Sequence, residues 1–221
     1  MQHNMSTLAD IEWASDTKPR MTNLYTSSKR LFDVVLAVTG LLLLAPVIAV
    51  LGLLIKLESS GPVFFSQSRC GLKGAPFRFW KFRSMVVDAE ARKTELMQET
   101  KGDLRFKMVD DPRITWIGKF IRKYSIDELP QLWNVLIGDM SLVGPRPPLP
   151  DEVAQYSAHA WHRLDVIPGI TCTWQIGGRS QIPFPEQVEL DLSYIRTRSL
   201  RNDFVILLRT SVAVLAARGA C

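Results

Sequence analysis

The chain has little cysteine and little histidine, with three of each among 221 residues. Cys70, Cys172 and Cys221 are scattered and lack the spacing of a zinc site. Their low and odd number is typical of free thiols in a reducing compartment rather than of a disulfide framework. The histidines form no metal-binding or catalytic-triad pattern. We therefore expect any chemistry to rest on carboxylates, arginines and lysines.

Signatures of nucleic-acid binding are also missing from the sequence. It contains neither a helix-turn-helix nor an RNA-binding motif, and its formal charge of +5 at pH 7 is moderate. That charge accompanies a long apolar run near the N-terminus. We therefore expect no nucleic-acid partner, and instead an anionic membrane surface or a phosphorylated substrate.

The composition changes along the chain predict a tail, a membrane segment and one further domain. Residues 1–28 are polar and aperiodic, which is typical of a mobile tail. The apolar run over residues 34–55 would cover about 33 Å as a helix, enough to span the hydrocarbon core of a bilayer. We assign the membrane segment to residues 29–57 and a cytoplasmic or interfacial catalytic domain to residues 58–221.

Two topologies are open for the membrane segment. Pro46 lies near its middle, where it removes a helix hydrogen bond and favours a kink or a break. Lysines and arginines flank the segment on both sides, and positive charge marks the cytoplasmic side of a membrane. A helix-break-helix that enters the membrane and returns would keep both flanks in the cytoplasm. A kinked transmembrane helix is the alternative.

The pattern downstream predicts an α+β fold that is mainly helical. Residues 63–67 and 77–82 have the composition of two strands joined by a turn, which predicts a β-hairpin. Residues 115–124 predict a basic amphipathic helix, which either lies in a membrane interface or, as is commoner, packs on the core with its basic edge in solvent. Residues 168–171 are predicted to be a turn, and residues 204–217 a core or interfacial helix.

Two adjacent carboxylates, Asp127 and Glu128, precede a second amphipathic helix, which ends at Gly138. The start of this helix can be placed in two ways. Ser125 can be the N-cap in a capping box with Glu128, or Pro130 can be the first helical residue. In both, the acids lie where backbone N–H groups and the helix dipole favour negative charge.

These acids have two interpretations. Acidic residues at such a position are usually helix caps. A helix N-terminus is also a site for phosphate, and cations are close in sequence, namely Arg113, Lys119, Arg122 and Lys123. Carboxylates among cations suit a metal-assisted reaction on a phosphate ester, with one acid as nucleophile or metal ligand and the other as its partner.

Two further arginines lie in segments with turn composition. Arg146 lies in the Pro-rich segment 144–150, which cannot be regular helix or central strand. Arg179 lies in the small loop 177–180. Loops of this kind often carry functional side chains, and both arginines are candidates for anion contacts.

Several short segments occur in an order that resembles one known family. They are Lys29-Arg-Leu-Phe-Asp33, Gly61-Pro-Val-Phe-Phe65, Lys81-Phe-Arg83, Asp111-Pro-Arg113, Ser125-Ile-Asp-Glu-Leu-Pro-Gln-Leu132, Gly138-Asp-Met-Ser-Leu-Val-Gly-Pro-Arg-Pro147, and Pro168-Gly-Ile-Thr171 with Gly178-Arg179. Each is weakly specific alone, whereas their number and order are specific. From about Lys29 to Ala217 the chain resembles the bacterial sugar transferases, the monotopic phosphoglycosyl transferases that act on polyprenyl phosphate.

The resemblance implies a re-entrant membrane helix broken at Ala45-Pro46, with the catalytic domain on the cytoplasmic face of the bacterial inner membrane. Ala45 stands where the family often has Ser, so a Ser–backbone bond at the break is lost. The implied reaction is transfer of a sugar-1-phosphate from a UDP-sugar to undecaprenyl phosphate, with Mg²⁺ and release of UMP. Because a larger N-terminal membrane domain is missing, we expect a small member that starts exopolysaccharide, capsule or glycoconjugate assembly.

The resemblance also implies roles by position. Asp127 would be the nucleophile that forms an aspartyl phosphosugar, and Glu128 its partner, with both acids as metal ligands. Arg122 would bind phosphate, and Arg146 would contact the nucleotide. The further substrate-binding positions would be Lys81, Arg113, Arg179 and Asp203.

Three other functions would use the same residues. A membrane-bound phosphatase and an ordinary glycosyltransferase are the enzyme alternatives, and the latter would release UDP. A membrane-anchored scaffold would use the acids only as caps, so that Asp127→Asn would cost some stability and nothing else. A homodimer is compatible with the sequence.

Overall fold

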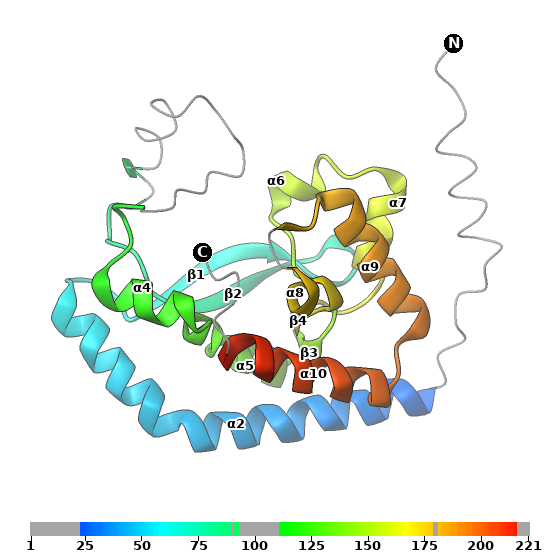
Figure 1. Ribbon diagram of the computed structural model, residues 1–221, viewed down its shortest axis with the longest axis horizontal. Coiled ribbons are helices and arrows are strands. Elements are labelled where there is room, and N and C mark those ends of the chain that lie inside the picture. Colours follow the sequence, from blue (N-terminus) through cyan, green and yellow to red (C-terminus); the bar gives the residue numbers. More distant parts are fainter. Residues whose placement is uncertain (1–22, 90, 93–110, 179–180, 216–221) are drawn as a thin grey trace, which may run out of the picture.

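The computed structural model describes residues 23–89, 91–92, 111–178 and 181–215, and this part is mainly helical with two small sheets (Figure 1). The helices are α2 (Asn23–Glu58), α4 (Trp116–Lys123), α5 (Gln131–Ile137), α6 (Pro150–Val153), α7 (Ala158–Trp161), α8 (Thr173–Gly177), α9 (Phe184–Thr197) and α10 (Leu200–Leu215). Short 3-10 helices are η1 (Leu72–Gly74), η2 (Ile126–Glu128) and η3 (His162–Asp165). The mainly helical α+β architecture predicted from the sequence is confirmed.

Helix α2 runs along one side of the molecule (Figure 1). It is uninterrupted, with Pro46 inside it, and Figure 1 shows it bending in its C-terminal half. The helical backbone therefore continues through Ala45-Pro46, where the sequence predicts a break, because losing one backbone donor bends a helix while turns on both sides continue it. The helix also begins at Asn23, within the predicted tail, rather than at Lys29. Among the described residues, α2 is the one helix long and apolar enough to cross a membrane.

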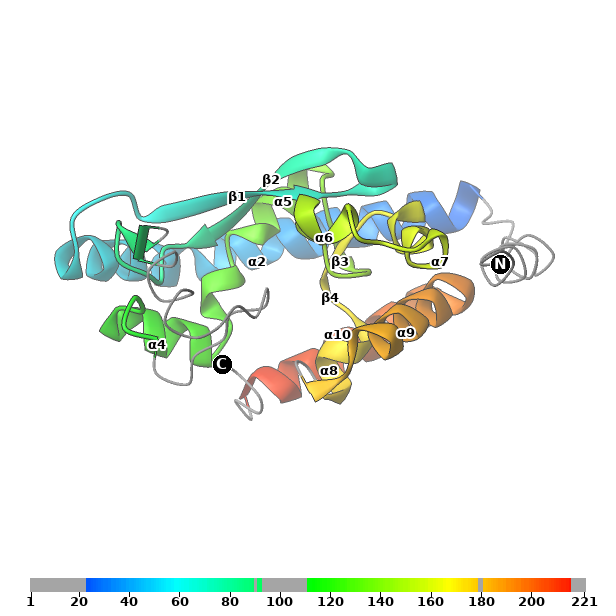
Figure 2. The same ribbon diagram turned by 90° about the horizontal axis from the view of Figure 1, so that it is seen from above.

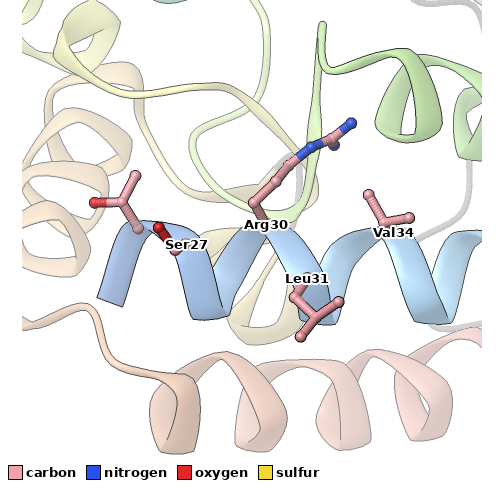
Figure 3. Close-up of a pocket in the computed structure, with 5 residues that line it drawn as sticks. Ser27, Arg30, Leu31 and Val34 are labelled. Atoms are coloured by element: carbon pink, nitrogen blue, oxygen red, sulfur yellow. The ribbon is translucent and has the colours of Figure 1, made fainter. Parts of the chain in front are cut away.

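Arginines tie α2 to the remainder of the protein. Arg30 donates to two carbonyls near the end of α5 at 2.5 and 2.8 Å, and Figure 3 shows it leaving α2 on the side opposite Leu31. Arg83 donates to the carbonyls of Ser59 and Ser60, just beyond α2, at 2.8 and 2.7 Å. Both arginines thus satisfy carbonyls at or beyond a helix end, which lack a partner within the helix.

The predicted hairpin is confirmed as strands β1 (Phe64–Cys70) and β2 (Pro76–Phe82), which pair antiparallel. The turn closes with a bond of 2.8 Å from Gly71 N to Ala75 O. The register places Gln67 opposite Phe79 and Phe65 opposite Lys81. Because side chains alternate along a strand and paired residues share a face, Gln67, Arg69, Phe79 and Lys81 lie on one face of the hairpin.

The second sheet corrects the turn predicted at residues 168–171. Strands β3 (Ser141–Val143) and β4 (Gly169–Thr171) pair in parallel, and in Figure 2 they lie between the hairpin and helices α9 and α10. Pro168 has no N–H and so donates no hydrogen bond to the sheet, but its carbonyl accepts one from Ser141 N at 2.8 Å. The backbones approach so closely that a Cβ at Gly169 would collide with Gly144 N. A Pro-Gly pair therefore starts a strand here because glycine permits the close approach.

Helix α5 packs between α2 and the hairpin. Its buried Asn134 donates to Arg78 O at 2.6 Å and accepts from Trp80 N at 3.1 Å, so it satisfies the free backbone edge of β2. The main core surrounds this junction and contains Ala37, Phe79, Val135, Met140, Leu142, Val143, Ala160, Val166, Val188, Leu192, Tyr194, Ile195 and Ile206. This packing fixes the segment before α5 relative to β2.

Candidate active site

Asp127 and Glu128 form the end of η2, between α4 and α5. Ser125 precedes them with a φ of 55°, and its side chain makes no capping bond. The capping-box interpretation is therefore wrong. Helix α5 starts directly after Pro130, so both acids lie ahead of its first turn, close to the second placement predicted. Within the described ranges, the ion-pair partners of the two carboxylates are Lys81 and Arg146.

Lys81 on β2 and Arg146 converge on these acids. Lys81 Nζ lies 2.9 Å from Glu128 Oε1 and 3.5 Å from Asp127 Oδ2. Arg146 Nη1 lies 3.6 Å from the same Glu128 oxygen. The side chains retain some exposure, from 11% for Asp127 to 31% for Arg146. The site is thus enclosed enough to strengthen electrostatic interactions, and open enough for a substrate.

The two carboxyls have opposite pKa shifts. Burial raises the pKa of Asp127, and the opposing charge of Lys81 does not cancel this effect. Burial also acts to raise the pKa of Glu128, but Lys81 and Arg146 together outweigh it and lower the pKa. Neighbouring acids with divergent pKa values are typical of catalytic pairs whose members have different roles.

The segment that carries Arg146 follows β3 and is held by three backbone hydrogen bonds, two to β4 and one to the hairpin. Gly144 N donates to Thr171 O at 3.0 Å, and Gly169 N donates to Pro145 O at 2.9 Å. From the hairpin, Cys70 N donates to Pro148 O at 3.0 Å. The Pro-rich loop is therefore rigid through its backbone contacts as well as through its prolines.

The other predicted site residues lie at various places. Arg122 on α4 forms no ion pair in the part of the chain that the structure describes, although its charge lowers the pKa of Asp127. Arg113 forms a buried ion pair with Asp111 at 2.7 Å. Arg179 lies outside the described residues.

Asp203 is fully buried in a different polar network. It accepts from Lys29 Nζ at 2.8 Å and from Tyr194 Oη at 2.7 Å, and Tyr194 Oη also lies 3.1 Å from Val143 O. This network joins the start of α2 and helices α9 and α10 to β3, which precedes the Arg146 loop. In the structure Asp203 therefore supports the site through the chain's own packing.

One cation close to the site was missed in the sequence. Arg69 on β1 donates to Pro147 O at 3.1 Å, directly beside Arg146. The signal was present in the hairpin pattern, because alternation places Arg69 and Lys81 on the same face once the turn is located. Local composition alone gave no reason to single it out.

The donor set of the site suits a hard divalent cation. Among the described residues, no group of three or more His, Cys, Asp and Glu side chains is gathered for a metal. Mg²⁺, however, commonly binds one or two carboxylates together with substrate phosphates. Asp127 and Glu128, as adjacent carboxylates, fit that pattern.

Large apolar side chains are exposed on the helices around the site. On α4 and α5, Trp116 is 80% exposed and Trp133 51% exposed, and on α10 Leu208 and Val212 are exposed. A separate shallow groove of about 500 Å³ runs along the start of α2, away from the acids, lined by Thr26, Ser27, Arg30, Leu31 and Val34 (Figure 3). Exposed tryptophans and other large apolar side chains are typical of a surface that contacts a partner or a membrane.

Comparisons with known proteins all return sugar transferases or polysaccharide-production proteins. A family model described as bacterial sugar transferase matches residues 24–217. The chain is 51% identical to the galactosyl transferase CpsE of Streptococcus agalactiae, over 87% of this chain and 43% of that protein. It is 40% identical to the undecaprenyl-phosphate galactose phosphotransferase of Salmonella typhimurium, over 87% and 41%. It is 37% identical to the exopolysaccharide production protein ExoY of Sinorhizobium fredii, over 87% and 88%. The chain thus spans about two fifths of the first two relatives and most of the third.

Proposed function

Since the chain belongs to the bacterial sugar transferase family, we propose that it transfers a sugar-1-phosphate from a UDP-sugar to undecaprenyl phosphate and releases UMP. The observation that carries this proposal is the convergence of Lys81 and Arg146 on the adjacent acids Asp127 and Glu128. The names of the relatives support the lipid acceptor and the sugar-phosphate donor. The reaction moves a phosphorylated sugar from the diphosphate of the donor to the phosphate of the lipid. Preorganised cations beside carboxylates can stabilise the negative charge of such a transfer.

Asp127 is the proposed nucleophile. Its pKa is raised and its ion pair with Lys81 is the longer one, so its oxygen is the more basic and the less tightly held. A carboxylate oxygen attacks the β-phosphorus of the UDP-sugar, and an O–P bond forms as the bond to the bridging oxygen breaks. UMP leaves with that oxygen.

The second displacement restores the protein. An oxygen of undecaprenyl phosphate attacks the same phosphorus, and the O–P bond to Asp127 breaks. The product is a lipid diphosphate that carries the sugar, and the Asp127 carboxylate returns to its starting state. A covalent intermediate lets the nucleotide leave before the lipid occupies the site.

Glu128, Lys81 and Arg146 prepare the site for this charge-rich reaction. The two cations hold Glu128 ionised, and their remaining N–H groups can donate to phosphate oxygens. Asp127 and Glu128 would hold Mg²⁺, which when bound would offset the negative charge of the diphosphate. In the folded protein these groups are already oriented, so little reorganisation accompanies charge development.

Helix α2 and its neighbours suit a membrane-bound acceptor. The phosphate of a polyprenyl lipid lies at the membrane surface, so the acids must reach that depth. The apolar exposed length of α2 and the exposed tryptophans of α4 and α5 support a site held at the cytoplasmic surface of the inner membrane. A re-entrant α2, with both ends cytoplasmic, is the topology we propose.

The donor is proposed to be a UDP-hexose, in exopolysaccharide, capsule or glycoconjugate assembly. Relatives are named for galactose and for glucose-1-phosphate transfer, and others for exopolysaccharide production. These names support a hexose as the transferred sugar.

Nucleotide release tests the proposed reaction. The purified protein is incubated with undecaprenyl phosphate, Mg²⁺ and a panel of UDP-sugars, and UMP and UDP are separated and quantified. We expect UMP from one sugar, and none from Asp127→Asn. UDP as product would indicate an ordinary glycosyltransferase, and UMP that survives the substitution would exclude Asp127 as nucleophile.

A further inference from the structure

Arg69 is a partly buried cation on the same hairpin face as Lys81. Its Nη1 donates to Pro147 O and its Nη2 to Gln67 Oε1, both at 3.1 Å. Its Nε is enclosed and has no hydrogen-bond partner among the described residues. The guanidinium therefore uses its two outer nitrogens as a fork, which joins strand β1 to the loop beside Arg146.

No ion pair accounts for the charge of Arg69 within the described ranges. Among its charged neighbours, the like charge of Arg146 has a larger effect on its pKa than the opposite charges of Glu152 and Glu128. Burial, followed by the charge of Arg146, lowers the pKa of Arg69 to about 10. Placing one cation beside another in a partly enclosed site costs free energy, which a neutral side chain would avoid. Such a local conflict is expected where a bound anion offsets it.

Phe79 links Arg69 to the lysine of the catalytic cluster. The Arg69 guanidinium carbon lies 5.3 Å from the centre of the Phe79 ring, and Lys81 Nζ lies 5.4 Å from the same centre. Phe79 is 2% exposed and belongs to the main core, so its ring is a fixed support for both cations. Lys81 reaches the acids, whereas Arg69 reaches the Arg146 loop.

We propose that Arg69 is a positioning residue that holds the Pro147 carbonyl, and with it Arg146, in the orientation that receives the anionic part of the donor nucleotide. This inference rests on the proposed function. The bond from Cys70 N to Pro148 O holds the next residue of the loop from the same strand. Arg69 thus acts on the donor through Arg146, and contacts neither Asp127 nor Glu128.

The expected kinetic signature separates positioning from mere folding. The proposed contact of Arg146 is with the nucleotide part of the donor, which is bound before and during the reaction, so loss of the support from Arg69 should weaken donor binding in both states. Loss of such uniform binding raises KM and leaves kcat nearly unchanged. A purely structural role would instead reduce the fraction of folded protein, which lowers apparent kcat at constant KM.

The test measures UMP release against UDP-sugar concentration for Arg69→Lys, which keeps the charge but cannot form the fork. We expect KM for the donor to rise about tenfold, with kcat within about threefold of the wild type. Arg78→Lys, at an exposed position of β2 on the same hairpin, is the matched control and should leave both parameters unchanged. If Arg69→Lys folds poorly, Gln67→Leu removes only the partner of Nη2 and should raise KM in the same direction. An unchanged KM in a folded variant would overturn the positioning role.

Hydrogen–deuterium exchange of the protein without substrate decides the same question independently of turnover. We expect Arg69→Lys to accelerate exchange at the Cys70 and Gly169 amides, which donate to Pro148 O and Pro145 O of the loop, and to leave exchange in α9 unchanged. Wild-type exchange at both amides would contradict the proposal. Absence of UMP from wild-type protein would contradict the proposed function instead, and the exchange comparison would still decide whether Arg69 positions the loop.

Discussion

The ammonium of Lys81 lies 2.9 Å from Glu128 Oε1, although 47 positions separate the two residues in the chain. This contact joins strand β2 to the short η2 helix, and Asn134 of α5 bonds to the backbone of the same strand at Trp80 and Arg78. Lys81 also faces Asp127 at 3.5 Å. Lys81 therefore acts to lower the pKa of both acids.

Replacing Lys81 by Met should shift the pH dependence of turnover. Lys81 lowers the pKa of both Asp127 and Glu128, so its loss should raise both pKa values. We expect kcat/KM to fall by about a hundredfold or more, and the acidic limb of the pH profile to move to higher pH. Lys73→Met is the control, because Lys73 is exposed and pairs with Asp165 away from the acids. An acidic limb that stays in place would show that Lys81 does not tune the nucleophile.

Replacing Asp127 by Asn should abolish turnover without lowering stability. Burial raises the pKa of Asp127 above its ordinary value of 3.8, so the carboxyl ionises less readily in the folded than in the unfolded chain. Its contribution to stability is present below the unfolded pKa and is lost as pH rises through the folded pKa. At neutral pH the neutral Asn should therefore give a Tm equal to or above that of the wild type, with the difference shrinking on acidification. Thermal unfolding followed by circular dichroism measures this. A clearly lower Tm at neutral pH would favour a capping role.

Replacing Gly169 by Ala should displace the Arg146 loop. The added Cβ would collide with Gly144 N, so β3 and β4 must separate at the point where the loop begins. We expect a loss of about 1–3 kcal/mol in the free energy of unfolding, and a fall in UMP release. Gly177→Ala is the matched control, because a Cβ there meets no atom of the described residues within 4 Å. Equal activity of the two variants would contradict a rigid Arg146 loop.

Replacing Glu128 by Gln should weaken the response to Mg²⁺. Removing one of two adjacent carboxylates removes a charged ligand, so we expect the Mg²⁺ concentration for half-maximal UMP release to rise about ten- to a hundredfold. Glu189→Gln controls for the loss of a carboxylate, because Glu189 is exposed and pairs with His159. An unchanged Mg²⁺ titration would place the ion elsewhere.

The sequence predicted elements whose signals are local. Strand alternation with a Gly-containing turn located the hairpin, and Gly138, with a φ of 98°, ends α5 as expected. The parallel pair was missed because β3 and β4 have three residues each, and Pro168-Gly169 has the composition of a turn. Short strands of this kind are specified by their partners rather than by their own pattern.

The acids, Arg146 and Lys81 could be proposed from the sequence and its family resemblance, whereas the ion pairs among them could not. Lys29 and Asp203 form a buried pair across 174 positions, and no periodicity relates them. Tertiary packing decides whether a charged side chain lies in the substrate site or forms an ion pair within the protein. Arg69 is the intermediate case, because the hairpin register alone would have placed it on the face of Lys81.

The most direct test is the stoichiometry of UMP release without acceptor. Protein is mixed with the UDP-sugar that it uses and Mg²⁺, in the absence of undecaprenyl phosphate, and UMP and the intact protein mass are measured together. We expect a burst of no more than one UMP per protein, and a mass increase of one sugar phosphate on the peptide that contains Asp127. Release of UMP only when the lipid phosphate is present, with no change in protein mass, would contradict a covalent Asp127 intermediate.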